Sequence, residues 1–356
     1  MYNDDRKEES KKISSLSSTS DVLKSRSKIE NQIRSLLLEE GYTEVRTPII
    51  NRYADIAPIT QFKVQSPLEQ TELYLRIAPT EQLKKLIHYG LDNIFEFSTN
   101  FRNDSIDSKH LFEFTSLEIM DRDSSVFDKM DQAESILKSS MQYCREEMPE
   151  NFSKKFCDTS DSIWPRIDII KYLLTEYNIN VSEDSCVNKL KKLYEDLYNT
   201  SCPYNNKNEL IVSIVDYLGL KTDVPTFVGN FPWEIEGPAK LGNDNIGKER
   251  YELYYNGVEI ANMSSTLIDY NQLRKWYFDT LEKKNKFEGK EYNIDPELLY
   301  IFENNMPKSA VVGIGIDRLI MLLLNKEKIS DVVCFDNKEK VKTRKIGGMY
   351  GKTNSK

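Results

Sequence analysis

Charged side chains occur in several segments of this sequence whose residue pattern predicts β-strands. Arg102 ends one such segment, Glu252 and Glu259 lie along another, and Arg318 follows a glycine-containing apolar run. A charge inside an apolar strand is costly unless it meets a partner, a metal or a ligand. Arginine forks suit phosphate oxygens, paired carboxylates suit Mg²⁺, and an aromatic ring such as Phe114 can stack on a base. Together these residue types predict a site for ATP with Mg²⁺.

The elements that must position these groups are predicted from hydrophobic periodicity. Residues 93–104 and 110–121 both alternate between apolar and polar positions, and the polar stretch between them predicts a β-hairpin with a charged loop. His110 stands where that loop would meet a phosphate. The same reasoning predicts helices from Ser20 to a stop at Gly41, at 80–91 and at 125–146. It predicts strands that end at Pro48 and at 72–79, 225–232 and 250–265, and a strand that enters a helix over 309–324. The predicted fold class is α+β, an antiparallel sheet flanked by helices.

Composition excludes several other classes of protein. The 356 residues carry a net charge of −8, which is a poor match to a protein that grips long nucleic acid. Two histidines and five scattered cysteines argue against a histidine metal site, a Ser-His-Asp hydrolase and a cysteine zinc motif. No apolar run approaches the ~18 residues of a membrane span, and the first residues lack the apolar core of a secretion signal. We therefore expect a cytoplasmic protein without membrane contact.

The chain is predicted to contain one catalytic domain between two tails. Residues 1–20 are polar and rich in serine and lysine, which predicts a disordered tail, and residues 337–356 form a basic tail. The domain itself covers 21–336, with a mostly helical insertion at about 150–222. The run "GIGIDR" lacks the glycine spacing and the lysine of the Rossmann and P-loop phosphate cradles.

Six segments, in order, resemble class II aminoacyl-tRNA synthetases, and lysyl-tRNA synthetase in particular. The similarity spans roughly residues 25–335. The segments "GYTEVRTPII", "FRND…KHLFEFTSLE" and "GIGIDRLIML" look like motifs 1, 2 and 3, and "YLRIAPTEQLKKLI", "FPWEIEGPAK" and "YELYYNGVEIAN" also resemble the lysyl enzyme. The resemblance implies an antiparallel sheet with flanking helices and a homodimer through motif 1. It also implies attack of an amino-acid carboxylate on the α-phosphate of ATP, giving an aminoacyl adenylate and pyrophosphate.

The resemblance assigns roles residue by residue. Arg102 would bind the α-phosphate and the amino-acid carboxylate, and Arg318 would face the γ-phosphate. Glu252 and Glu259 would hold Mg²⁺, with Glu259 also beside the amino acid. The remaining implied ATP contacts are Asp104, His110 and Phe114, and the implied amino-acid contacts are Glu118 and Asn262.

The departures from the lysyl pattern concern the amino-acid side chain. Where lysyl enzymes surround the substrate ammonium with Glu, Tyr and Glu, this chain has Thr80, Met120 and Thr266. Ser264 replaces a phenylalanine, and Val311 replaces a glycine and should shorten the pocket. A buried ammonium without a carboxylate would cost several kcal/mol, so a smaller or uncharged amino acid is expected, unless Glu81 supplies a replacement charge. Asp104, where the family has Glu, reaches one methylene less far toward adenine.

The acceptor of the activated amino acid is a separate question. Lysyl enzymes read the anticodon with an N-terminal OB-fold domain, for which this chain has no room before Gly41. Its layout resembles the truncated paralogue that attaches an amino acid to a lysine of elongation factor P. The first hypothesis is therefore transfer to a protein side chain, a small molecule or a peptide intermediate. The alternatives are a minimal synthetase that recognises only the tRNA acceptor stem, and a non-catalytic paralogue that senses an amino acid or nucleotide.

Overall fold

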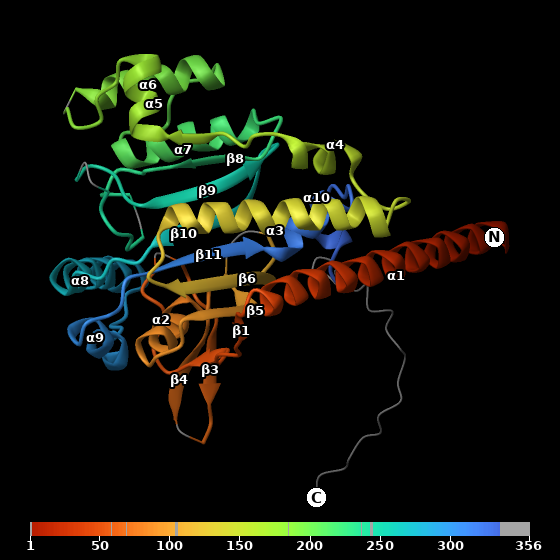
Figure 1. Cartoon of the computed structure of the whole chain (residues 1–356), viewed down its shortest axis with the longest axis horizontal. Coiled ribbons are helices and arrows are strands. Elements are labelled where there is room, and N and C mark those ends of the chain that lie inside the picture. Colours follow the sequence, from red (N-terminus) through yellow and green to blue (C-terminus); the bar gives the residue numbers. More distant parts are fainter. Residues whose placement is uncertain are drawn as a thin grey trace, which may run out of the picture.

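The core of the protein is one large sheet (Figure 1). The computed structural model describes residues 2–57, 59–68, 70–103, 106–183, 185–235, 237–242 and 245–334, with side chains from residue 20 onward. The sheet order is β1 (Thr43–Glu44), β5 (Asn93–Phe101), β6 (Glu113–Arg122), β11 (Ser309–Gly315), β10 (Val258–Ser265), β9 (Arg250–Tyr255), β8 (Thr226–Gly229) and β7 (Arg166–Asp168). The five inner pairings are antiparallel, and only the edge strands β1 and β7 pair in parallel. The predicted α+β class is confirmed.

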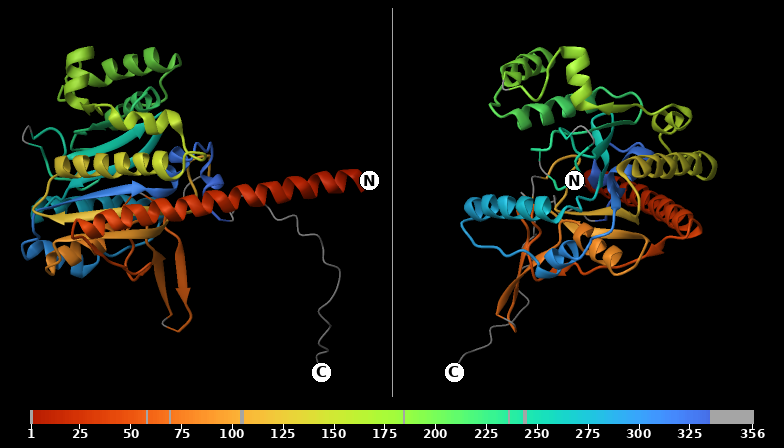
Figure 2. Two further views of the ribbon diagram at one scale, coloured as in Figure 1. Left: turned by 45° about the vertical axis from the view of Figure 1, so that its right-hand side comes forward. Right: turned by 60° about the vertical axis from the view of Figure 1, so that its left-hand side comes forward.

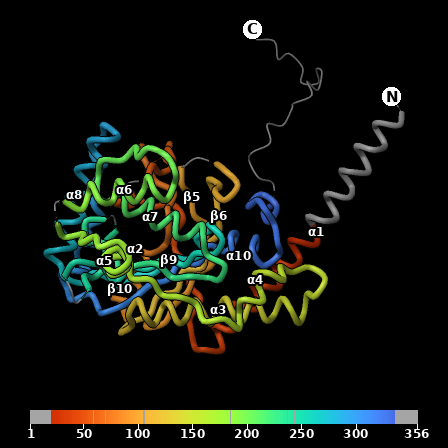
Figure 3. Tube along the Cα trace, turned by 90° about the horizontal axis from the view of Figure 1, so that it is seen from above, coloured from red at the N-terminus to blue at the C-terminus, as the bar shows by residue number. Residues whose placement is uncertain are grey.

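Helices cover both faces of this sheet (Figure 2). On one face α1 (Tyr2–Glu39), α3 (Val126–Glu147) and α10 (Ile316–Leu323) pack on the inward residues of the central strands, and α4 (Lys154–Cys157) lies against them. On the other face α2 (Thr80–His88), α8 (Tyr270–Glu288) and α9 (Pro296–Glu303) cover one end. A third apolar cluster is formed by α5 (Ile169–Tyr177), α6 (Cys186–Tyr198) and α7 (Lys207–Leu220), and it includes Tyr254 of β9. Seen from above, these helices lie over this end of the sheet (Figure 3).

Strict alternation along the central strands separates an apolar face from a polar one. In β6, Leu117 and Ile119 are fully buried under α1 and α3, whereas Ser116 and Glu118 point to the opposite face. Because side chains alternate with period two in a strand, every hydrophobic position fixes the face of its polar neighbours. The polar face between the α2, α8, α9 group and the α5–α7 group is therefore the place where functional side chains can gather.

Several predicted elements are confirmed with small changes at their ends. The hairpin of β5 and β6 is in register from Asn93↔Asp121 to Phe101↔Glu113, and β11 enters α10 as predicted. Helix α3 begins at a capping box in which the Ser125 and Asp128 side chains bind each other's backbone N–H groups.

Other predicted elements differ in the structure. The predicted strand ending at Pro48 is reduced to β1. Beyond that proline, β2 (Ile50–Asn51) joins a small sheet with β4 (Thr71–Leu75) and β3 (Lys63–Ser66). Helix α1 begins at Tyr2 and so runs through the stretch for which a disordered tail is expected. That stretch contains no glycine or proline that would end a helix. The basic tail at 337–356 lies outside the described residues.

The helical segment predicted at about 150–222 is more than an inserted module. It contains the 3₁₀ turn η1 (Asp158–Asp161) and supplies β7 to the main sheet, and α7 packs against β9 and β10. A second 3₁₀ turn, η2 (Ile329–Asp331), follows α10. In the described ranges no helix has both the length and the apolarity needed to cross a membrane.

Candidate active site

A row of paired positions crosses five strands on the polar face of the sheet, with polar side chains on four of them. Strand register places Glu96 of β5 opposite Glu118 of β6, Glu118 opposite Gly313 of β11, Gly313 opposite Asn262 of β10, and Asn262 opposite Glu252 of β9. Directly paired residues project from the same face of a sheet. The predicted residues Glu118, Asn262 and Glu252, which are far apart in sequence, therefore lie in one line.

Gly313 opens the middle of this row. An added Cβ at Gly313 would lie 2.6 Å from Oε1 of Glu118, so the Glu118 carboxylate occupies the space above the glycine. The carboxylate thus reaches from β6 toward Asn262 on β10. Sequence analysis had not identified this glycine, although a glycine inside an apolar strand often marks a close approach of this kind.

The neighbouring row holds the predicted side-chain pocket. Val311 pairs with both Met120 and Ser264, and Thr266 is two residues further along β10 on the same face. Met120 is fully buried and packs with Val311 in the apolar cluster of α2, α8 and α9. The buried hydroxyls of Thr266 and Ser309 are 2.9 Å apart and form a hydrogen bond with each other.

Thr80 lies on a helix and is not part of either row of paired strand positions. It is the first residue of α2, is half-buried, and makes no side-chain hydrogen bond within the described part of the chain. Asp104 lies outside the described residues, so its predicted adenine contact stays a prediction.

Arg102 lies at the open end of β5 with part of its guanidinium unpartnered. Its Cζ is 5.1 Å from the centre of the Phe114 ring, and its buried Nε has no hydrogen-bond partner in the part of the chain that the structure describes. A buried N–H without a partner is costly, so this atom marks a place where a ligand acceptor would be stabilised. Arg102 also faces Glu118: burial raises the pKa of Glu118, and the positive charge of Arg102 opposes that rise.

Arg318 lies on the first turn of α10, directly after β11, and contacts the loop that joins β5 and β6. Its Nη1 donates to the backbone oxygen of Glu259 at 2.9 Å and lies 3.4 Å from Oε2 of that residue. Its Nη2 is 2.8 Å from Nε2 of His110, and Nδ1 of His110 is 2.8 Å from Asp107. Arg102 begins the loop and His110 ends it. The two arginines therefore flank one loop and do not lie on opposite surfaces.

The predicted metal-binding carboxylates are close enough to repel each other. Burial, together with the charges of Glu259 and Asp216, raises the pKa of Glu252 to about 7, although Arg250 opposes the rise. Glu252 accepts hydrogen bonds from Arg250 at 2.6 Å, Tyr254 at 2.7 Å and Asn262 at 3.1 Å. Asp216, on α7, has its pKa raised to about 6 by burial and by Glu259. Sequence analysis missed it; the available signal was an acid within the apolar run "IVSIVDYL".

This set of donors fits a divalent cation that also binds phosphate. A cation would relieve the repulsion among the acids, and Mg²⁺ is usually held by one or two carboxylates together with phosphate oxygens and water. Among the described residues, no group of three or more His, Cys, Asp or Glu side chains forms a complete metal site. Glu252 and Glu259 could therefore hold Mg²⁺ only with ligands from ATP and water.

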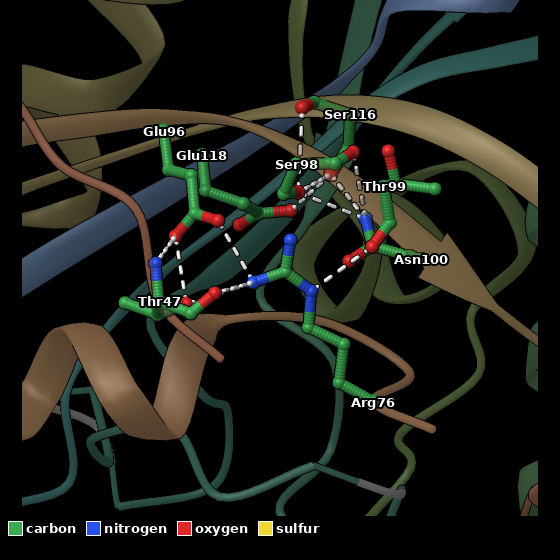
Figure 4. Close-up of polar contacts among 8 residues, drawn as sticks. All are labelled: Thr47, Arg76, Glu96, Ser98, Thr99, Asn100, Ser116 and Glu118. Atoms are coloured by element: carbon green, nitrogen blue, oxygen red, sulfur yellow. Dashed lines mark hydrogen bonds and ion pairs between the residues drawn. The ribbon is translucent and has the colours of Figure 1, made fainter. Parts of the chain in front are cut away.

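A buried network at the β5 end of the row was also missed by sequence analysis (Figure 4). Arg76 and Glu96 form an ion pair at 2.8 Å in which each side chain is 3% exposed, and Thr47 binds both. Ser98, Asn100 and Ser116 continue this network to Glu118. The only sequence signal was an arginine inside the apolar strand "YLRIAP".

A separate cavity of about 250 Å³ lies on the α1 side of the hairpin. Arg26, Thr115 and Asp317 contribute to its lining, and Phe114 is the one predicted site residue among its lining residues. Arg26 already binds Asp317 at 2.5 Å and Thr115 at 3.1 Å. The cavity therefore does not coincide with the row of acids and arginines.

The fold and the paired rows together define the catalytic fold of the class II aminoacyl-tRNA synthetases. The family model "tRNA synthetases class II (D, K and N)" matches residues 9–339, so this chain belongs to that family. It is 33% identical over 319 residues to a lysine–tRNA ligase of Prochlorococcus marinus, covering 88% of this chain and 62% of the relative.

Two further lysine–tRNA ligases show the same extent of similarity. That of Buchnera aphidicola subsp. Acyrthosiphon pisum is 30% identical over 322 residues, and that of Pseudomonas fluorescens is 29% identical over 314 residues. The chain spans about 62% of the length of these relatives. Their region of similarity includes the rows described above.

Proposed function

We propose that this protein activates an amino acid with ATP and Mg²⁺, forming an aminoacyl adenylate and pyrophosphate. Membership of the synthetase family makes a ligase of this class the expected activity. The observation that carries the proposal is the buried Nε of Arg102, which has no hydrogen-bond partner among the described residues. This arginine lies beside Phe114, and its charge acts on Glu118. The free arginine donor can bind a phosphate oxygen, the aromatic ring can stack on the adenine base, and the carboxylate can pair with the ammonium of the amino acid.

The chemistry requires no protein nucleophile. An oxygen of the amino-acid carboxylate attacks the α-phosphorus, and the bond to the β-phosphate oxygen breaks to release pyrophosphate. Arg102 would stabilise charge on the α-phosphate, and Arg318 would hold the γ-phosphate together with His110. Mg²⁺ bound by Glu252 and Glu259 would supply charge neutralisation at the phosphates. The contribution of the protein is therefore positioning and electrostatic stabilisation.

The proposed substrate has a small or uncharged side chain. The positions that the resemblance assigns to the side-chain pocket are Thr80, Met120, Ser264, Thr266 and Val311, none of which carries charge. Met120 and Val311 are packed in an apolar cluster, and the Thr266 hydroxyl is already bound to Ser309. An ammonium placed there would lose its hydration without gaining a carboxylate.

Glu81 is a poor replacement for the missing carboxylates. Burial and the neighbouring charge of Asp55 raise the pKa of Glu81 to about 8, so the group is largely protonated at neutral pH. Its Oε1 is 3.4 Å from the Tyr277 hydroxyl on α8. This supports an uncharged side chain over lysine.

The acceptor in the proposal is a protein side chain, a small molecule or a peptide intermediate, and the enzyme acts as a homodimer through the motif 1 segment. Transfer to the acceptor stem of a tRNA is the alternative. Charging of total tRNA with the activated amino acid separates the two, because a minimal synthetase would aminoacylate tRNA and the proposed enzyme would not.

The activation step is tested by amino-acid-dependent exchange of pyrophosphate into ATP, screened over all the standard amino acids. We expect exchange with one or a few small or uncharged amino acids. Arg102→Lys should lower kcat/KM by about a hundredfold or more, because lysine cannot replace a fixed fork at phosphorus. Arg166→Lys, on the edge strand β7, is the control and should stay near wild type.

Two results would contradict the proposal. Silence of the wild-type protein with every amino acid, while ATP still binds, would favour the sensing paralogue. Exchange with lysine alone would leave activation standing and overturn the proposed substrate class.

A further inference from the structure

The orientation of Glu118 is fixed by side chains that the proposed reaction does not itself use. Ser116, two residues earlier on β6, donates its hydroxyl proton to Oε1 of Glu118 at 2.9 Å. Ser116 is 5% exposed and Glu118 is 8% exposed, so water is largely excluded from this contact.

The direction of the Ser116 proton follows from its other partners. Nδ2 of Asn100 lies 2.8 Å from Ser116 Oγ, and an amide NH₂ can only donate. The Ser98 hydroxyl lies 3.0 Å from Ser116 Oγ and 2.9 Å from Nδ2 of Asn100. Glu118, when ionised, can only accept. Asn100 therefore supplies a hydrogen to Ser116, and the single hydroxyl proton of Ser116 goes to the ionised Glu118. The Ser98 hydroxyl can then donate to Ser116 Oγ or to the backbone oxygen of Ser116 at 3.4 Å.

The hydrogen bond from Ser116 is one of several interactions that set the pKa of Glu118. Burial raises the pKa of Glu118, and the hydrogen bond from Ser116 lowers it, as do the charges of Arg102 and Arg76, whereas Glu96 raises it. Glu96 is itself paired with Arg76 at 2.8 Å. Ser116 thus stabilises the charged form of a carboxylate that burial would otherwise neutralise.

The position of Glu118 indicates which part of a substrate it would meet. Its carboxylate lies above Gly313, within the range of the positive charge of Arg102. In an amino acid the ammonium and carboxylate are bonded to one carbon. If Arg102 binds the carboxylate, the neighbouring acid is placed for the α-ammonium, independently of the side chain.

We propose that Ser116, held by Asn100 and Ser98, is a positioning residue that aims and ionises Glu118 for the α-ammonium of the amino-acid substrate. This inference rests on the proposed function, because it assumes that an amino acid binds at this row. Ser116 would touch no substrate atom and would act only through Glu118.

The test compares Ser116→Ala and Ser116→Thr in pyrophosphate exchange with the amino acid that the wild-type protein activates. Ser116→Ala should raise the KM for the amino acid about tenfold, the loss expected for one hydrogen bond to a charged group. The KM for ATP and kcat should stay within about twofold. The acid limb of the pH profile of kcat/KM for the amino acid should move to higher pH, because Glu118 then ionises less readily. Ser116→Thr keeps the hydroxyl and should restore both quantities.

A purely structural role for Ser116 would give a different pattern. Ser140→Ala removes another fully buried serine hydroxyl, on α3 behind the sheet, and serves as the matched control. An unchanged amino-acid KM and acid limb in Ser116→Ala would overturn the inference. So would equal losses for ATP and amino acid with a lowered Tm that Ser116→Thr does not recover. Silence of the wild-type protein with every amino acid would instead defeat the proposed function and the inference with it.

Discussion

Two buried arginines show how partners separate a structural side chain from one available to a ligand. Arg76 donates to the Thr99 carbonyl at 2.9 Å, to Thr47 at 2.8 Å and to Glu96 at 2.8 Å. Arg102, in contrast, has a buried Nε that meets no hydrogen-bond partner within the described ranges. Since buried polar groups are normally satisfied, the first arginine fixes the fold and the second is the one with capacity for a phosphate.

Glu81 provides a prediction at the same scale. Its pKa rises from 4.5 to about 8 on folding because burial and Asp55 oppose ionisation. The folded state therefore binds the proton more tightly, and the associated stability is present below pH 4.5 and is lost as the pH rises through about 8. Glu81→Gln cannot ionise and avoids this loss. We expect its Tm to exceed that of the wild type by about 1–2 °C at high pH, a shift of the size that ~1 kcal/mol produces in a chain of 356 residues.

The measurement is thermal unfolding of both proteins between mildly acidic and mildly alkaline pH. The exposed Glu303 on α9 gives the control, because Glu303→Gln should differ from the wild type by a constant amount. A Glu81→Gln curve that runs parallel to the wild type at every pH would contradict the assigned cause.

Among the elements, β11 carries two glycines on one face, of which only the first has no space for a side chain. A Cβ at Gly313 would lie 2.6 Å from the Glu118 carboxylate, whereas a Cβ at Gly315 would meet nothing closer than 3.5 Å. Gly313→Ala must therefore displace Glu118 or shift the strand, and Gly315→Ala adds ordinary contact. We expect Gly313→Ala to raise the KM for the amino acid about tenfold or more, in line with the ~1–3 kcal/mol cost of overpacking.

Gly315→Ala is the matched control, two residues along the same strand. It should keep the amino-acid KM within about threefold of the wild type. Exchange kinetics for the two variants, with circular dichroism to confirm folding, decide the matter. Equal behaviour of the two alanine variants would show that Glu118 does not need the space above β11.

At the scale of the whole molecule, apolar side chains remain exposed around the motif 1 segment. Ile49 is 40% exposed, Ile50 on β2 is 50% exposed, and Leu38 at the end of α1 is 50% exposed. Neighbouring exposed apolar side chains of this kind mark interaction surfaces. The proposed homodimer would cover them, and Thr47, which lies beside them in sequence, binds Glu96 of the site row.

The dimer is tested by Ile49→Asp in sedimentation equilibrium. We expect the wild type to sediment as a dimer and the variant to dissociate about a hundredfold more readily, because a buried unpaired carboxylate is strongly unfavourable at an interface. Ile163→Asp changes another exposed isoleucine, 91% exposed and outside the motif 1 segment, and should leave the dimer intact. A monomeric wild-type protein, or an Ile49→Asp variant that stays dimeric, would exclude this interface.

Local sequence pattern was enough to predict the features that depend on one segment at a time. Period-two alternation predicted β5, β6, β9 and β10, and an apolar run with glycines predicted β11 and its passage into α10. Glu118, Glu252 and Arg318 lie on the predicted elements, whereas Arg102 directly follows β5. Helical periodicity also predicted α3.

Tertiary structure alone decided the features that depend on strand register. The pairing of Glu118 with Gly313, the ion pair of Arg76 with Glu96, and the approach of Asp216 to Glu252 all join residues on different elements. The order of polar groups across the row is set by which strands lie side by side and by their offset. Periodicity within one strand carries no information about either, so the Asn100–Ser116–Glu118 network and the gap above Gly313 appear only in the folded chain.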